Sequence, residues 1–295
     1  MLRYLNPSRF LRKQPLIGID IAVDGIKLVQ LQKSAGQYHL EKIIHRKVSN
    51  QLLIEECLKI IVDDFSLKKY GAIIAVPYQE VVAKQLQLPD HLSLKELKYE
   101  IKNRFLSYFA QVPENEWCYD YFITTNVNNA NHIHAVAVRN STFHSKLNLL
   151  KVAGLIPKIV DINTYALARA AQLSHDEPVI LLDCSSLVFS FIVTHAGKII
   201  FQQSCLLDSS DGCGQTLKSF WQHYTSTFTR KINLVLISGD LVSEAWLQEV
   251  HRTLNISTAI LNPFKNIVVA KDMATILTKL PLASFALCCG LALRL

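Results

Sequence analysis

Residues 16–31 read LIGIDIAVDGIKLVQL, and this stretch decides the fold. Apolar residues alternate with small or polar ones on both sides of a short acidic turn, which predicts two neighbouring strands buried in a sheet. The pair Asp24-Gly25 predicts a type I′ hairpin turn, because both central positions of that turn need a positive φ. Asp20 ends the first strand, and a buried carboxylate there must meet a cation, a metal or several donors. The plainer alternative is that Asp20 only bonds the backbone of the turn.

The chain repeats this opening at residues 179–193, VILLDCSSLVFSFIV, where Asp183 stands in the place of Asp20. In each copy an alanine–glycine turn, Ala35-Gly36 or Ala196-Gly197, opens a third strand. Such internal similarity indicates a duplicated β-meander, one at the start of each half. Two strand–aspartate–turn units that face each other across a cleft suit a metal-bound phosphate. The N–H groups of the turns would cradle the phosphate oxygens, and the carboxylates would hold the metal through water.

Further motifs follow in a characteristic order. They are Ala75-Val76-Pro77, Leu86-Gln87-Leu88-Pro89, LKEL at 94–97, AVAVR at 135–139, AGLIPKIVD at 153–161, GQTL at 214–217, NPFKNI at 262–267 and SFALCCGLAL at 284–293. In order and spacing the chain resembles the PilM family of type IV pilus assembly proteins, part of the actin-like ATPase superfamily that includes the cell-division protein FtsA. The resemblance implies an α/β, actin-like (RNase H-like) fold with two lobes, duplicated β-meander halves and an α+β insertion in the first lobe.

The predicted elements and the resemblance together divide the chain into three parts. Residues 1–80 and 154–175 form the first lobe, residues 81–153 an inserted α+β subdomain, and residues 176–295 the second lobe. Within the insertion, Ser93 and Glu96 have the spacing of a capping box, which predicts a helix that begins there.

The resemblance also implies a nucleotide site with ATP and magnesium as its cofactors. Its cofactor-binding positions are Asp20, Lys27, Asp161, Asp183, Ser185 and Gly239, of which Asp20 and Asp183 are the metal positions. The surrounding turns depart from the family pattern. Ala22 stands where glycine is expected, and forcing alanine into a left-handed conformation costs roughly 1–2 kcal/mol. Asp24 adds negative charge beside a polyanion, and Asp240 and Leu241 fill space needed by adenosine. We therefore expect weak or lost ATP binding, no catalytic residue and no hydrolysis.

Composition limits the classes of partner. The formal net charge of the 295 residues is +7, but the basic residues are dispersed and no aromatic residues interleave with them, so nucleic acid is not an expected partner. No run of about 18 uncharged apolar residues occurs, which predicts no membrane-spanning helix. The seven cysteines are scattered and odd in number. They fit the reduced thiols of a cytosolic protein better than a disulfide framework.

The resemblance implies a cytoplasmic scaffold of the pilus assembly machinery at the inner face of the inner membrane. It would be peripheral to that membrane through its partner, a PilN-like inner-membrane protein whose short N-terminal tail it binds. In that family the tail lies beside the insertion, so residues 81–153 are expected to contribute to the groove.

Three alternatives stay open. One is an actin-like kinase or ATPase that acts on a small molecule. Another is an RNase H-like nuclease, whose first strand also runs Ile-Gly-Ile-Asp but which needs a cluster of carboxylates around two metal ions. The third is the cytoplasmic domain of the GspL family of secretion machines. Chains of that family continue into a transmembrane helix, whereas this sequence ends at Leu295, which favours PilM.

Overall fold

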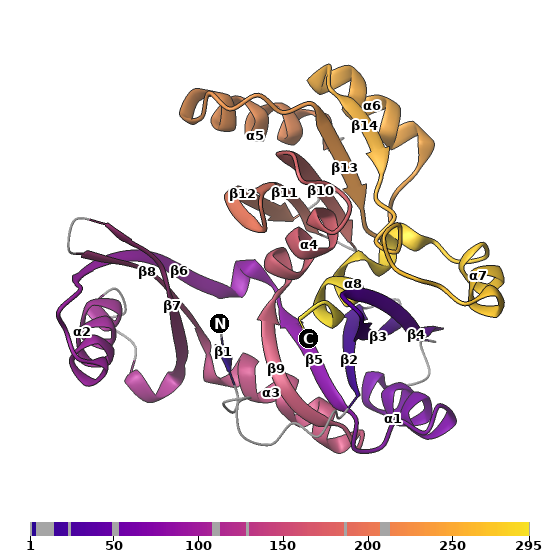
Figure 1. Ribbon diagram of the computed structural model, residues 1–295, viewed down its shortest axis with the longest axis horizontal. Coiled ribbons are helices and arrows are strands. Elements are labelled where there is room, and N and C mark those ends of the chain that lie inside the picture. Colours follow the sequence, from indigo (N-terminus) through magenta and orange to yellow (C-terminus); the bar gives the residue numbers. More distant parts are fainter. Residues whose placement is uncertain are drawn as a thin grey trace.

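The computed structural model describes residues 2–3, 15–22, 25–48, 53–107, 113–127, 130–185, 188–206 and 213–294. Within these ranges the chain forms a six-stranded, a five-stranded and a three-stranded sheet. The two larger sheets lie one above the other in Figure 1, and the third projects to the left.

The first sheet combines a meander with parallel strands. In spatial order its strands are β1 (Leu2–Arg3), β9 (Ile156–Ile162), β5 (Gly71–Val76), β2 (Leu16–Ala22), β3 (Gly25–Ser34) and β4 (Gln37–Lys47). The β2–β3–β4 unit is antiparallel, whereas β2, β5 and β9 run parallel. On one face, Ile17 and Ile19 join a core that includes α1 (Ile54–Asp64) and α3 (Asn140–Val152).

The second sheet repeats this plan. Its spatial order is β12 (Lys198–Leu206), β11 (Val188–His195), β10 (Val179–Ser185), β13 (Leu234–Ser238) and β14 (Ser257–Ile260). Again an antiparallel meander is extended by parallel strands on the side of its first strand. The side chains of α5 (Cys213–Thr227) and α6 (Glu244–Leu254) complete an aromatic-rich core with this sheet. The predicted duplication is therefore present in the fold.

The turns of the two meanders differ from the sequence prediction in one respect. Ala22 and Gly25 are paired across β2 and β3, so Gly25 lies in the strand and is not a central residue of the hairpin turn. Val23 and Asp24, between these paired residues, lie outside the described residues. Gly25 is needed for close approach, since a Cβ there would lie 2.9 Å from the carbonyl oxygen of Arg46. The positive-φ pairs occur instead at Ala35-Gly36 and Ala196-Gly197.

The third sheet is antiparallel, with the order β6 (Val81–Pro89), β8 (Ala130–Arg139) and β7 (Trp117–Val127). The helix α2 (Leu94–Leu106) packs on it through Leu97 and Ile101. As the capping box predicts, Ser93 N donates to Glu96 Oε2 at 2.9 Å, and Glu96 N donates to Ser93 Oγ. By contrast, α3 follows this sheet in sequence but packs on β5 and β9 of the first sheet.

Two helices lie between the larger sheets, as Figure 1 shows: α4 (Asn163–Gln172) and the closing α8 (Ala286–Ala292). The helix α8 packs against β2, β3 and α4. Small residues allow this approach, because a Cβ on Gly18 would overlap the Cys288 carbonyl and one on Gly290 would overlap the Ala166 carbonyl. The C-terminal helix therefore packs on the first sheet, although it follows the second sheet in sequence. The short α7 (Lys271–Leu277) precedes it.

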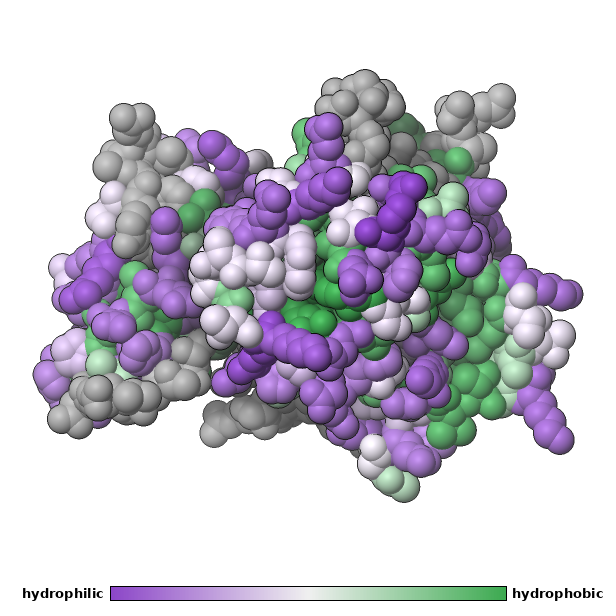
Figure 2. Space-filling model, turned by 90° about the horizontal axis from the view of Figure 1, so that it is seen from above, coloured by the Kyte–Doolittle hydropathy of each residue, from purple (hydrophilic) through white to green (hydrophobic). Residues whose placement is uncertain are grey.

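Apolar residues reach the surface in separate patches. Seen from above, most of the visible face is hydrophilic, with apolar areas between the polar side chains (Figure 2). Leu94 and Leu206 are the most exposed of the described large apolar side chains, at 76% and 75%.

Among the described residues, no single helix has both the length and the apolar composition to cross a membrane. One bent pair, Lys271–Leu277 with Leu282–Ala292, meets both criteria only when the two are taken together across a 110° bend.

Candidate functional site

The carboxyl ends of the central strands bring most of the predicted site residues together. Asp20 on β2 is paired in register with Lys27 on β3, so the two side chains share one face of the first sheet. In the second sheet, Asp183 on β10 is paired with Ser238 at the end of β13. The two sheets contribute one polar cluster at their interface, which consists of Asp20, Lys27, Asp183, Ser185, Ser238 and Asp240.

Lys27 is the central cation of this cluster. It is fully buried, and its Nζ lies 2.7 Å from Asp240 Oδ1 and 4.0 Å from Asp20 Oδ2. The nearer carboxylate follows β13, whereas Lys27 belongs to β3, so this ion pair connects the two sheets. A buried lysine needs such a partner, because removing its charge from water without compensation is very costly. The sequence prediction assigned Lys27 to phosphate and treated Asp240 only as a residue that fills space.

Asp183 is held in its place by hydroxyl groups. Ser238 Oγ donates to its Oδ1 at 2.6 Å, and Ser185 donates a further hydrogen bond. Burial raises the pKa of Asp183, and the charge of Asp240 adds to the rise, against the opposing effects of the hydroxyl groups and Lys27. The carboxyl therefore keeps its proton more readily than an ordinary aspartate does.

Gly239 has a structural reason to be glycine. Its φ is +108°, and a Cβ at this position would overlap the backbone of Cys184 on β10. Two backbone hydrogen bonds fix the turn: Leu241 N donates to Cys184 O on β10, and Gly239 N donates to Ala283 O just before α8.

Asp161 belongs to a different cluster. Its side chain is 5% exposed and lies between two arginines, with Oδ2 2.5 Å from Arg169 Nη2 and Oδ1 2.7 Å from Arg294 Nη1. Arg169 also donates from Nε to the carbonyl of Gly290. Burial alone would raise the pKa of Asp161, but the two guanidinium groups outweigh it and hold that pKa below its ordinary value. We call this group the arginine clamp; it ties β9, α4 and the C-terminal helix together.

The described residues do not fit magnesium-bound ATP in this arrangement. The cation that would meet phosphate is already paired with Asp240. In the described ranges no group of three or more His, Cys, Asp or Glu side chains could hold a metal ion. Asp24, whose negative charge was expected beside the phosphates, lies outside the described residues, and so does Ser186, the residue after Ser185.

Sequence reasoning missed the residues that complete these clusters. No sequence motif predicted the polar contacts of four residues: Asp240, Ser238, Arg169 and Arg294. The available signal for Asp240 was its position: it follows the end of β13, and the parallel strand β10 beside it carries Asp183 at the level of Ser238. Because the carboxyl ends of adjacent parallel strands meet at one edge of a sheet, a lysine that faces this edge would attract the carboxylate of Asp240.

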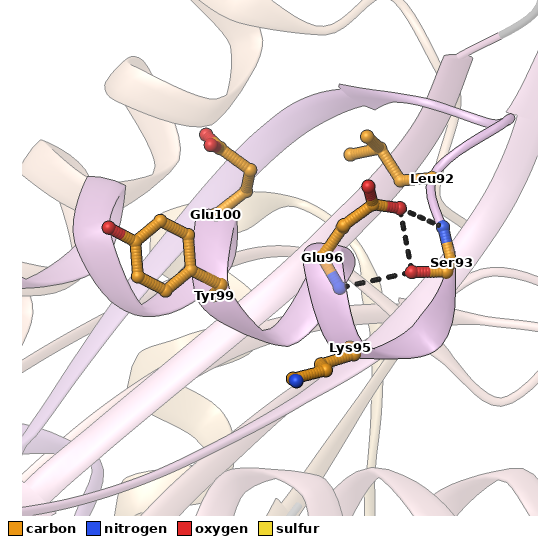
Figure 3. A pocket seen from close by; sticks show the side chains of 6 residues that line it. All are labelled: Leu92, Ser93, Lys95, Glu96, Tyr99 and Glu100. Atoms are coloured by element: carbon orange, nitrogen blue, oxygen red, sulfur yellow. Dashed lines mark hydrogen bonds between the residues drawn. The ribbon is translucent and has the colours of Figure 1, made fainter.

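A hollow of about 560 Å³ lies elsewhere, on the first turns of α2. It is lined by Leu92, Ser93, Lys95, Glu96, Tyr99 and Glu100. In the view of Figure 3, Leu92, Glu96 and Glu100 point to one side of the helix and Lys95 to the other. The hydrogen bonds of the Ser93 hydroxyl and backbone lower the pKa of Glu96, which therefore stays ionised at neutral pH.

The family model described as type IV pilus assembly protein PilM matches residues 18–207. A solved chain of a PilM–PilN type IV pilus biogenesis complex is 18% identical, with 96% of this chain and 99% of that chain covered and a TM-score of 0.78. A Bacteroides thetaiotaomicron protein with an actin-like ATPase fold and unknown function is 15% identical, with 90% and 96% covered and a TM-score of 0.51. The cytoplasmic domain of EpsL, an inner-membrane component of the type II secretion system of Vibrio cholerae, is 10% identical, with 78% and 84% covered and a TM-score of 0.48. The first two likenesses confirm the predicted actin-like fold.

Proposed function

The chain belongs to the PilM family of type IV pilus assembly proteins, and from this premise we propose that it is a scaffold that binds a PilN-like partner without needing ATP. The observation that carries the proposal is the match over almost the whole length of a chain from a PilM–PilN type IV pilus biogenesis complex. The ion pair of Lys27 with Asp240 supports the proposed independence from ATP, because the lysine already has an anionic partner within the protein.

In this proposal the chain works at the cytoplasmic face of the inner membrane and reaches that membrane only through its partner. The partner contributes the short tail that precedes its own membrane segment. The inserted subdomain, proposed at residues 81–153, supplies part of the groove. A contact with the first lobe supports a preformed groove, since Tyr165 on α4 hydrogen-bonds His134 on β8 at 2.8 Å. A preorganised surface loses less entropy when a flexible tail binds.

The exposed apolar residues around the hollow on α2 are the proposed contact of this subdomain. Leu94 is 76% exposed and Tyr99 64%, next to charged residues that can satisfy the backbone of an extended tail. A large exposed apolar side chain on a rigid helix is a typical anchor position for a peptide.

Leu94→Asp is expected to weaken binding of the partner's N-terminal tail by about tenfold or more, because the change places a charge in an apolar contact. Fluorescence anisotropy with a labelled tail peptide measures this. Leu206→Asp is the matched control, since the residue is equally exposed but lies on β12 of the second sheet. Equal affinities of the two variants would exclude this contact. Deleting residues 81–153 is a poor test, because Phe143, Leu147 and Leu150 of α3 belong to the core of the first sheet.

The unfolding temperature of the wild-type chain is expected to stay unchanged when ATP and magnesium are added at millimolar concentration. A bound ligand at a hundred times its dissociation constant would add about 2.7 kcal/mol to the free energy of unfolding, which a thermal titration detects easily. A saturable rise that disappears in Asp20→Ala would contradict the proposed loss of ATP binding. It would also favour the kinase or ATPase alternative.

A further inference from the structure

Asp240 has a role that goes beyond filling space. We propose that its carboxylate is a built-in substitute for a nucleotide phosphate, which neutralises Lys27 and thereby links the two sheets without a ligand. The inference deepens the proposed function and rests on it, since it explains why this member of the family would need no ATP.

The burial of Lys27 is the first step. No part of the side chain is exposed, so its ammonium group requires an anion from within the protein or from a bound molecule. On its own sheet the carboxylate of Asp20 lies 4.0 Å away, which is at the limit of an ion pair. The close anion, at 2.7 Å, comes from the other sheet.

The position of Asp240 is the second step. The residue follows Gly239, whose backbone is pressed against Cys184 of β10, so the carboxylate is directed by a turn that cannot shift easily. Asp183 lies beside the same turn, since it accepts a hydrogen bond from Ser238, two residues before Asp240. The cluster thus contains the lysine and both metal-position aspartates of the predicted site, with Asp240 as an additional anion. A phosphate entering here would be repelled by Asp240 and would have to displace it from Lys27.

If Asp240 lost its charge, Lys27 would become the cation to which a phosphate could bind. Lys27 would keep Asp20 at 4.0 Å, so the fold has partial compensation and the variant is expected to remain folded. Lys27 would then be a buried cation without its close carboxylate, and it would bind a polyanion such as triphosphate strongly.

The test compares the wild type, Asp240→Ala and the shape-preserving Asp240→Asn by thermal titration with two probes. The probes are ATP with magnesium and inorganic triphosphate with magnesium. Both variants are expected to bind inorganic triphosphate at least about tenfold more tightly than the wild type does. A response to both probes would mean that the site accepts a nucleotide, and a response to triphosphate alone that it accepts only the phosphate group. Either response supports the inference, provided that it is lost when Lys27→Ala is added to the Asp240 variant.

Asp272→Ala is the control for the change in net charge, because Asp272 is exposed on α7 and far along the chain from this cluster. An equal gain in affinity for triphosphate in Asp272→Ala would overturn the inference. So would folded Asp240→Ala and Asp240→Asn proteins that bind neither probe, although the proposed function would then stand. If instead the wild type binds ATP as tightly as the variants do, the proposed loss of ATP binding fails as well.

Discussion

Replacing Asp161 with asparagine is expected to lower the free energy of unfolding by about 3 kcal/mol or more. The substitution keeps the size of the side chain but removes the charge that two arginines share. Arg294 is 9% exposed and Arg169 26%, so neither guanidinium group can turn fully to water. Removing one partner of a buried ion pair typically costs 3–5 kcal/mol, because an uncompensated charge is left behind. Urea denaturation, with the midpoint and slope fitted separately, measures the loss.

The matched control is Asp63→Asn, which breaks the exposed ion pair with Lys68. Both side chains there are more than half exposed, so the expected loss is below about 1 kcal/mol. The pH dependence gives a second readout. Because the pKa of Asp161 is lower in the folded state, its stabilising effect is present above the unfolded pKa and disappears as the pH falls through the folded pKa. Asp161→Asn should therefore flatten that acid-dependent part of the stability curve. Equal losses in the two variants would contradict the arginine clamp.

Gly290→Ala is expected to destabilise the chain by a similar amount, about 3 kcal/mol. A Cβ at this position would overlap the carbonyl oxygen of Ala166, and its three nearest atoms are all backbone atoms of that residue in α4. The helices α4 and α8 would have to move apart, which also disturbs the hydrogen bond from Arg169 Nε to the Gly290 carbonyl. Overpacking of a tight interior commonly costs 1–3 kcal/mol, and a clash with backbone belongs to the upper end of that range.

Gly214→Ala provides the comparison within another helix, α5. A Cβ there meets only the carboxylate end of Glu249, at 3.1 Å, which can swing away. Alanine is also the better helix former by about 1 kcal/mol. Stability should therefore stay equal or rise slightly in Gly214→Ala. If Gly290→Ala were as stable as this control, the close contact between α4 and α8 would not exist.

The sequence was informative about elements whose signals are local. The meanders, their repetition and the Ser93 capping box follow from short patterns, and each is present as predicted. One local signal was misassigned. Asp24-Gly25 resembles a hairpin turn in composition, but Gly25 is a strand residue that makes room for the Arg46 carbonyl. A glycine that a turn requires is easier to recognise from the sequence than a glycine that the close approach of a neighbouring strand requires.

The candidate site could be predicted only in part, because its energetics depend on residues far apart in sequence. Asp20 and Asp183 follow from the repeat, yet the partner that determines the state of Lys27 is Asp240, 213 positions further along the chain. The clamp around Asp161 likewise needs Arg294 at the C-terminal end. No periodicity links such residues. Burial, which turns an ordinary lysine into one that must be paired, is also a property of the assembled sheets and not of the segment itself.

The most direct test of the central claim is the affinity of the full chain for the partner's N-terminal tail, measured by titration calorimetry with and without ATP and magnesium. A scaffold that needs no nucleotide predicts tight binding in both conditions, with dissociation constants that agree within about twofold. Coupled sites typically change each other's affinity by about 5–150-fold. Binding that appears only with ATP and magnesium, or no binding in either condition, would contradict the account.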